Sequence, residues 1–354
     1  MTRHEFITAD SICLQYIPDE SIDLIVTSPP YPMIEMWDEC FIGMNESIRD
    51  DFNNRRIQSA FNKMHSCLNN IWRECNRVLK KSGFICINIG DATRTFDSNF
   101  QLFCNHSKVI EYMSTLGYMQ MPPIIWHKPS NSPNKFMGSG MYPAGAYVTL
   151  EHEYILIFRN GGKRDFTEHE KHMRRESAYF YEERNKWFQD VWKINGTQQI
   201  IRQSNTRGRN ASYPFEIPYR LINMYSIKGD TVLDVFGGLG TTAIAAMSAE
   251  RNSISIDIDS AITDMAKERA CSAKEQINTY INNRLIAHNT FIHGIGAEKL
   301  NSFYDNVYHG TKVKTKQEVD LRINFMDSIA IDTADGSLLC EYTKENPNRP
   351  KGLF

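Results

Sequence analysis

Two consecutive prolines directly after an apolar run constrain this chain more than any other feature of its sequence. The run Ile22–Val26 predicts a buried strand. Pro29 and Pro30 lack a backbone N–H and cannot continue a β-ladder, so we expect the strand to end at Ser28 and the chain to turn rigidly toward Tyr31. In a parallel sheet such a turn lies at the carboxyl end of its strand, where ligands usually bind.

The side chains of this turn suit the recognition of a planar amine. The Ser28 hydroxyl and the Pro29 carbonyl can accept hydrogen bonds from an exocyclic NH₂ group, and Tyr31 can stack on the ring that carries it. A plain proline turn after a core strand explains the same residues without a ligand. The turn taken alone leaves both interpretations open.

Strand and helix patterns alternate along most of the chain. Apolar runs predict strands over 5–10, 22–26, 84–91, 121–128, 147–159, 231–236 and 253–257. Apolar spacing and glycine stop signals predict helices over 11–16, 59–79, 109–116 and 241–249, from 258 to about 282, and a helix or lid in the polar segment after Tyr31. Asp335-Gly336 predicts a hairpin between two apolar runs. The alternation predicts an α/β fold with a doubly wound, mostly parallel sheet.

A glycine-rich turn, Gly237-Gly238-Leu239-Gly240, joins the strand over 231–236 to the following helix. Glycines let a backbone pass close beneath a bound nucleoside. Asp257 ends the next strand, 19 residues after Gly238, which suits an acid that accepts from ribose hydroxyls. A structural tight turn is one alternative. A nicotinamide dehydrogenase is another, because Gly238–Ala243 satisfies the dinucleotide fingerprint with Ala last.

These two stretches carry a family resemblance. Asp234–Thr242 resembles the S-adenosyl-L-methionine motif of DNA amino-methyltransferases, and Thr27–Tyr31 resembles their catalytic motif in its Ser form. The catalytic motif comes first, the order of the circularly permuted beta class, and the resemblance covers about residues 6–270. It implies a seven-stranded sheet of the S-adenosylmethionine-dependent methyltransferase type, with the third strand at the N-terminus and a target-recognition insertion. It also implies S-adenosyl-L-methionine as cofactor and double-stranded DNA as partner.

The resemblance assigns roles residue by residue. It implies that Asp10 contacts the cofactor adenine, that Asp234 and Gly238 lie beside its methionine part, and that Asp257 binds the ribose, where Glu is commoner. The implied catalytic residues are Ser28, Pro29, Pro30 and Tyr31. The implied cofactor-binding residues are Asp10, Thr27, Tyr213, Asp234, Phe236, Gly237, Gly238, Gly240, Thr241, Thr242, Asp257 and Ile258. Trp126–Pro129 and His152–Tyr154 resemble later conserved stretches of the family.

The Ser form of the catalytic motif is most often seen in enzymes that methylate the N4 amine of cytosine, which we therefore expect here. Ser28 and the Pro29 carbonyl would localise the amine lone pair as it attacks, and the base must first be flipped out of the duplex onto Tyr31. The N6 amine of adenine is the alternative target. A nucleic-acid-binding module with an inactive cofactor site is an alternative of another class.

The region 161–209 is charged and aromatic, and we expect it to be the target-recognition region. The candidate DNA contacts are Lys163, Arg164, Arg174, Arg175, Arg202, Arg207 and Arg209. An exposed charged insertion is the alternative, and Trp187 and Trp192 are expected to form the core of the region. The flanking segments 1–160 and 210–283 are then the catalytic and cofactor-binding halves of one domain, and 284–354 is a C-terminal extension.

The composition limits which partners and which cellular compartment are expected for the chain. Lys and Arg total 40 and Asp and Glu total 42, so DNA affinity has to come from a local basic face. The eight cysteines lack a CxxC pair, and no signal peptide or membrane-spanning run is evident, which predicts a reduced cytoplasmic protein. His169 and His172 have the wrong spacing for a zinc site, and no metal is expected. A cognate restriction endonuclease is the expected functional partner, and the chain is expected to be a monomer or homodimer.

Overall fold

The computed structural model describes residues 1–128, 137–138, 141–196 and 213–345. Eleven strands within these residues form one central sheet. Its middle is five parallel strands in a fixed spatial order. In that order they are β3 (Leu79–Ile89), β2 (Ile22–Thr27), β12 (Thr231–Asp234), β13 (Asn252–Asp257) and β1 (Thr2–Thr8). The N-terminal strand thus lies at the far end of the parallel set, two places from the strand that carries Asp234.

Further strands extend both sides of this set, and the strand directly beside it on each side is antiparallel to it. Beyond β3 lie β10 (His152–Arg159), β7 (Ile124–His127) and β11 (Val191–Lys193), and β6 (Met119–Gln120) also pairs with β10. Beyond β1 lie β17 (Leu338–Thr343) and β16 (Phe325–Ile331). The segment expected to be a C-terminal extension therefore supplies two strands of the main sheet.

Helices cover both faces of the sheet, which explains the continuous apolar strands. All six residues of β2 are buried, with Ile25 in the core on one face and Leu24 and Val26 in the core on the other. On the first face lie α3 (Ile57–Val78) and α4 (Asn105–Thr115), and on the second lie α7 (Glu216–Tyr225) and α8 (Thr241–Ser248). The helix α9 (Ser260–Cys271) packs against β1 and β13.

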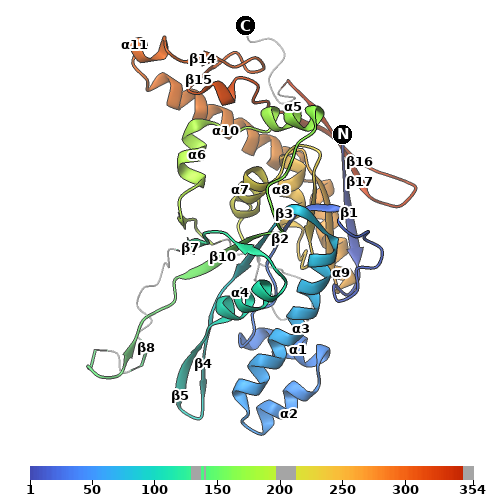
Figure 1. The fold of residues 1–354 in the computed structure, drawn as a ribbon, viewed down its shortest axis with the longest axis vertical. Helices are drawn as coiled ribbons and strands as arrows, with labels where there is room; N and C mark the ends of the chain where they lie inside the picture. The colour runs from blue at the N-terminus through green and yellow to red at the C-terminus, as the bar shows by residue number, and fades with distance from the viewer. Residues whose placement is uncertain (129–136, 139–140, 197–212, 346–354) are drawn as a thin grey trace.

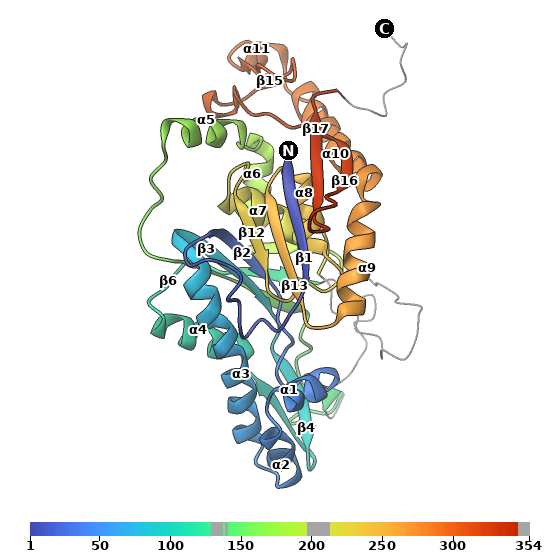
Figure 2. The same cartoon turned by 90° about the vertical axis from the view of Figure 1, so that its right-hand side faces the viewer.

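Two groups of elements project from opposite ends of the parallel strands (Figure 1). At the carboxyl ends are η1 (Glu35–Trp37), α1 (Asp38–Met44), α2 (Ser47–Asn53), the hairpin of β4 (Ala92–Phe96) and β5 (Asn99–Phe103), and the pair β8 (Met137–Gly138) and β9 (Ala146–Tyr147). At the amino ends, as Figure 2 also shows, are α5 (Glu168–Glu176), α6 (Tyr181–Trp187), α10 (Lys274–His293), α11 (Ala297–Leu300), β14 (Tyr304–Asp305), β15 (Lys312–Val313) and η2 (Lys316–Glu318).

The element predictions are confirmed in type for most of the chain, with two exceptions. The brief helix expected over 11–16 is wrong, because this segment is a series of turns held by a hydrogen bond from Ser11 Oγ to the Val235 carbonyl, 2.7 Å long. The helix expected from 258 to about 282 is two helices, α9 and α10, with a break at Ser272–Ala273. The hairpin at Asp335-Gly336 is confirmed, and its strands pair in register from Ile331 opposite Leu338.

Candidate active site

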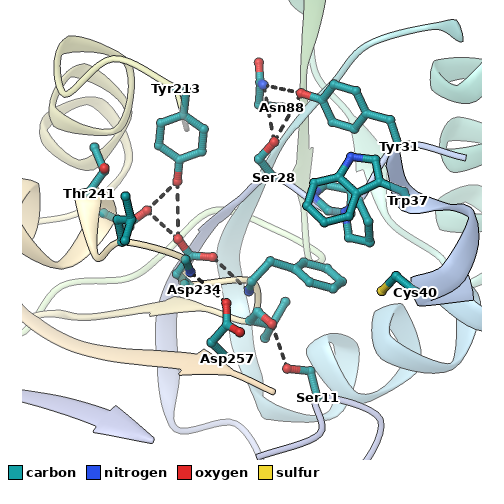
Figure 3. A pocket seen from close by; sticks show the side chains of 18 of the residues that line it. Ser11, Ser28, Tyr31, Trp37, Cys40, Asn88, Tyr213, Asp234, Thr241 and Asp257 are labelled. Atoms are coloured by element: carbon teal, nitrogen blue, oxygen red, sulfur yellow. Dashed lines mark hydrogen bonds between the residues drawn. The ribbon is translucent and has the colours of Figure 1, made fainter. Parts of the chain in front are cut away.

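One pocket at the carboxyl ends of β2, β12 and β13 holds both sequence motifs. Its volume is about 400 Å³. Figure 3 shows Ser28 and Tyr31 on one wall, with Asp234 and Asp257 below them. The two loops are far apart in the chain but meet here because β2 and β12 are neighbours, with Leu24 opposite Val232. Both motifs therefore line one cavity.

Most of the predicted site residues line this pocket directly. They are Asp10, Ser28, Pro29, Pro30, Tyr31, Tyr213, Asp234, Phe236, Gly237, Gly238, Thr241, Thr242, Asp257 and Ile258. Thr27 and Gly240 lie behind the wall. Thr27 is buried and donates to Asp234, and Gly240 precedes α8 with a φ of +72°, close to Ala266 and Phe6.

Asp234 is the centre of the hydrogen-bond network beneath the pocket. Its carboxylate accepts from Thr27 Oγ1 at 2.6 Å, Thr242 Oγ1 at 2.5 Å, the Phe236 N–H at 3.0 Å and the Tyr213 hydroxyl at 3.3 Å. Burial raises the pKa of Asp234, although the hydrogen bonds from Thr242 and Thr27 oppose that shift. Because its acceptor sites are occupied, Asp234 holds the shape of the loop that a ligand contacts.

The glycine turn is shaped by close contacts and by its link to Asp257. A Cβ atom on Gly237 would lie 2.1 Å from Ser255 Oγ, so no larger residue fits there without movement. Gly238, with φ at +48°, donates its N–H to Asp257 Oδ2 at 3.0 Å, and the other carboxylate oxygen accepts from the Asp259 N–H. The spacing of 19 residues seen in the sequence therefore corresponds to a direct contact.

The lining of this part fits a nucleoside with a charged tail. Phe236, Ile258 and Ile262 supply apolar walls for a base, and Asp257 supplies carboxylate oxygens for ribose hydroxyls. The turn brings backbone rather than side chains to the floor of the pocket. These groups are the ones that would hold S-adenosyl-L-methionine.

The other part of the pocket is a polar cluster around Ser28. The Tyr31 hydroxyl lies 3.2 Å from Ser28 Oγ and donates to Glu153 Oε2 at 2.8 Å. The Asn88 amide donates to Tyr31 Oη at 2.8 Å and to Glu153 Oε2 at 2.7 Å. Burial, and next the Glu153 carboxylate, raise the pKa of Tyr31 well above its usual value, so Tyr31 is a neutral donor.

Sequence reasoning missed a set of lining residues that come from other segments. Trp37, Cys40 and Met44 reach the pocket from η1 and α1, where a helix or lid was expected. A polar residue within a buried strand was the available signal for Asn88 and Glu153. The lining residues that received no individual role from the sequence are Ala9, Ser11, Ile34, Met36, Trp37, Cys40, Met44, Ile71, Asn88, Trp126, Lys128, Glu153, Gly196, Val235, Leu239 and Ile262.

The described candidate DNA contacts lie at the other end of the sheet. Arg164 bonds Asp230 at 2.8 Å and lies 3.7 Å from Asp23, and these two acids stand at the amino ends of β12 and β2. Arg175 pairs with Asp320, Arg174 lies over the Phe166 ring at 4.6 Å, and Lys163 is exposed. These four side chains are therefore paired or exposed near the amino ends of the strands, away from the pocket.

The rest of the region 161–209 gives a mixed result. Trp187 and Trp192 are buried, as expected of its core. Arg202, Arg207 and Arg209 lie outside the described residues.

In the described ranges no group of three or more His, Cys, Asp or Glu side chains is arranged to hold a metal. No helix in the same ranges has both the length and the apolar character needed to cross a membrane.

Comparison with known proteins decides the family. The model of the DNA methylase family matches residues 22–268. The type II methyltransferase M.MthZI of Methanothermobacter thermautotrophicus is 47% identical over 330 residues, which are 92% of this chain and 91% of that protein. The chain belongs to the DNA methylase family.

Other similar proteins agree with this assignment of the methylase. The type II methyltransferase M.MjaI of Methanocaldococcus jannaschii is 46% identical over 292 residues, 79% of this chain and 95% of that protein. TTHA0409 of Thermus thermophilus, a putative DNA modification methylase crystallised with S-adenosyl-L-methionine, has a TM-score of 0.59 at 28% identity and covers 77% of the methylase and 93% of its own chain. The PvuII DNA methyltransferase (cytosine-N4-specific) has a TM-score of 0.55 at 17% identity, with 80% and 93% covered, which shows the fold alone.

The sheet of the methylase is thus of the S-adenosylmethionine-dependent methyltransferase type, and S-adenosyl-L-methionine is its cofactor. The polar cluster around Ser28 and the glycine turn then have distinct tasks in one pocket. Both line the pocket, the first from the loop after β2 and the second from the loop after β12.

Proposed function

We propose that this methylase transfers a methyl group from S-adenosyl-L-methionine to the N4 amine of cytosine in duplex DNA. The observation that carries the proposal is the meeting of Ser28 and Tyr31 with the Asp234–Asp257 floor in one pocket. The Ser form of the Thr27–Tyr31 motif supports cytosine as the target base. The chain order, catalytic motif before cofactor motif, supports membership of the permuted beta class.

The main contribution of the protein to the reaction is to align the amine with the methyl group. When bound, S-adenosyl-L-methionine supplies a methyl group already activated on a sulfonium. Ser28 Oγ and the Pro29 carbonyl accept from the cytosine amine and localise its lone pair. The neutral Tyr31 phenol donates to Glu153 and not to the base, which leaves its ring available as a stacking surface. The Ser28 hydroxyl is too weak a base to remove a proton from the amine before the amine attacks the methyl group. The amine therefore loses its proton after the attack.

The elements at the carboxyl ends are our proposed DNA-binding side. Pairs β4–β5 and β8–β9 project from the same end of the sheet as α1 and α2 (Figure 1). Phe100 stacks on Tyr147 with ring centroids 4.5 Å apart, which joins the two pairs. Met141, Tyr142 and Val148 are exposed on this side. A base must leave the duplex to reach Ser28, so the duplex has to lie over these elements.

The biological setting is part of the same proposal. The type II relatives support a role in restriction and modification. We propose in addition a cognate endonuclease as partner, a cytoplasmic location, and a monomer or homodimer. We further propose that 1–160 and 210–283 act as the catalytic and cofactor halves and that 284–354 has a structural role. Target recognition by 161–209 would then fall to its part near Gly196, which lines the pocket, because Arg164 lies at the other end of the sheet.

Nucleoside analysis of methylated DNA tests the proposal. Purified protein is incubated with duplex DNA and labelled S-adenosyl-L-methionine, and the digested nucleosides are separated by mass spectrometry. N4-methylcytosine is the expected product. N6-methyladenine would overturn the choice of base. The absence of any methyl transfer to DNA by the folded wild-type protein would overturn the proposed function.

A serine variant assigns the reaction to the proposed site. Ser28→Ala removes the hydroxyl that orients the amine, and we expect the single-turnover rate to fall about 100-fold or more. Ser66→Ala is the matched control, because Ser66 is exposed on α3 and donates to the Asn62 carbonyl. A wild-type rate in Ser28→Ala would remove Ser28 from catalysis.

A further inference from the structure

Glu153 is an acid set within the central sheet, next to the pocket. It lies on β10, opposite Trp126 of β7, and its side chain is only 11% exposed. A carboxylate in such a position is costly unless its oxygens are paired. The groups that pair with the Glu153 carboxylate therefore indicate its role.

Three side chains from three different segments meet this carboxylate. Lys128 forms an ion pair with Oε1, and its ammonium group lies 5.0 Å from the Trp126 ring centroid. Oε2 accepts from the Tyr31 hydroxyl at 2.8 Å and from Asn88 Nδ2 at 2.7 Å. Glu153 thereby joins the loop after β2, strand β3 and the end of β7.

Two of these partners are also the neighbours of the Ser28 hydroxyl. Tyr31 Oη lies 3.2 Å from Ser28 Oγ, and Asn88 Nδ2 lies 3.4 Å from it. The Tyr31 ring is confined as well, because a Cβ atom on Gly90 would lie 2.9 Å from Tyr31 Cε2. The position of the Tyr31 hydroxyl thus depends on Glu153 on one side and on the Gly90 backbone on the other.

The orientation of Asn88 depends on the same carboxylate. A carboxylate can only accept, so the Nδ2 group has to face Glu153. This leaves Asn88 Oδ1 buried and without a hydrogen-bond partner among the described residues. A buried unpaired acceptor is unfavourable, and it is maintained here by the two bonds that Nδ2 makes on the other side.

We propose that Glu153 is a positioning residue for methyl transfer, which fixes the Tyr31 hydroxyl and the Asn88 amide so that both bracket Ser28 Oγ in its reactive orientation. Lys128 holds the carboxylate in place by its ion pair. Glu153 acts through Tyr31 and Asn88, since no direct contact joins it to Ser28 among the described interactions. The inference rests on the proposed function, because it gives the position of Ser28 a catalytic meaning.

Single-turnover methylation by variants of the full chain tests this role. Misplacing a reacting group by about 1 Å can cost about 100-fold in rate, so we expect that loss in Glu153→Ala. Glu153→Gln keeps one oxygen that accepts from Tyr31 and should lose only about tenfold. The dissociation constant of S-adenosyl-L-methionine and the KM for DNA should change less than about threefold, because the cofactor contacts lie elsewhere. Glu151→Gln is the matched control, since Glu151 precedes β10 and is partly exposed.

A double-mutant cycle separates positioning from general structural support. If Glu153 acts through the Tyr31 hydroxyl, Glu153→Gln should slow the Tyr31→Phe variant much less than it slows the wild type. Additive losses, a wild-type rate in Glu153→Ala, or an equal loss of cofactor binding in Glu153→Gln would overturn the proposal. Absence of transfer by the wild type would instead be a failure of the proposed function.

A spectroscopic measurement needs no activity. The Tyr31 ¹³Cζ resonance is assigned by its loss in Tyr31→Phe. We expect it to shift in Glu153→Gln and to stay in place in Glu151→Gln, because only the first substitution changes the acceptor of the Tyr31 hydroxyl. An unchanged resonance in Glu153→Gln would overturn the proposed contact.

Discussion

Asp257 shows how much one residue does at the floor of the pocket. Its two carboxylate oxygens accept from the N–H groups of Gly238 and Asp259, so it ties the end of β13 to the glycine turn. The same carboxylate faces the cavity, where ribose hydroxyls would reach it. It thus preorganises the turn and presents its carboxylate to the cavity, whereas Asp234 accepts hydrogen bonds from Thr27, Thr242 and Phe236 and holds the shape of its own loop.

Asp257→Ala should weaken cofactor binding more than it weakens the fold. We expect the dissociation constant of S-adenosyl-L-methionine to rise at least about tenfold, equal to about 1.4 kcal/mol, in isothermal titration calorimetry. Asp264→Ala is the control, because Asp264 is exposed on α9. Unchanged affinity in Asp257→Ala would contradict the ribose assignment.

At the scale of elements, the site depends on how closely one turn packs on a neighbouring strand. Gly237 donates its N–H to the Ile256 carbonyl at 2.7 Å, which presses the turn after β12 against β13. Gly240 then starts α8 in a left-handed conformation, and the helix runs back along the second face of the sheet. Turn, strand and helix therefore move as one unit, and a change at the turn reaches the pocket.

Gly237→Ala should disturb this unit. The added methyl group would meet Ser255 Oγ, and we expect a loss of about 1–3 kcal/mol in the free energy of unfolding together with weaker cofactor binding. Ser255→Ala in the same chain removes that oxygen and should restore part of both. Gly162→Ala is the control, since nothing lies within 4 Å of its added carbon. Urea denaturation measures the effect, and equal losses in both glycine variants would count against the packing argument.

At the scale of the molecule, both ends of the chain complete one sheet. The N-terminal β1 lies between β13 and β17, so residues near 2–8, 252–257 and 338–343 form adjacent strands. His4 lies in the middle of β1, fully buried, with its ring nitrogens 2.8 Å from Thr2 Oγ1 and Ser253 Oγ. Both partners are neutral, and nothing there compensates a charged ring.

The burial of His4 predicts a loss of stability in acid. Burial lowers the pKa of His4 from 6.5 to about 3, so the unfolded chain takes up a proton first as the pH falls. The stabilisation is complete above pH 6.5 and is lost between there and about pH 3, at about 1.4 kcal/mol per pH unit. Urea denaturation of His4→Gln should show a dependence on pH weaker by that amount. An identical dependence in the variant would refute the role of His4.

The loops that carry chemistry were predictable because their signals are local. A double proline ends a strand whatever surrounds it, and a glycine turn between a strand and a helix keeps its shape in many folds. Ser28–Tyr31 and Gly237–Gly238 are therefore found where they were expected. The contact from Gly238 to Asp257 was also predictable, since it follows from the spacing of two adjacent parallel strands.

The placement of the basic segment was not predictable in the same way. Arg164 lies in a charged stretch that looks like a binding surface, yet its guanidinium is paired with Asp230 and lies 3.7 Å from Asp23. These acids come from two other segments, and no local pattern connects them with Arg164. Charge in the sequence indicates what a side chain can bind, but its partners depend on which elements lie next to it.

The sequence by itself determined the strand ends, the two ligand loops and their order, because backbone restrictions of proline and glycine act over a few residues. Only the tertiary structure decided that Asn88 and Glu153 contact Tyr31 and that Lys128 pairs with Glu153. This cluster draws on two strands and on the segments that follow two others, and the order of the sheet sets which of them are neighbours. The tertiary structure also decided that residues 325–343 complete the sheet, since antiparallel pairing with β1 depends on which edge remains open.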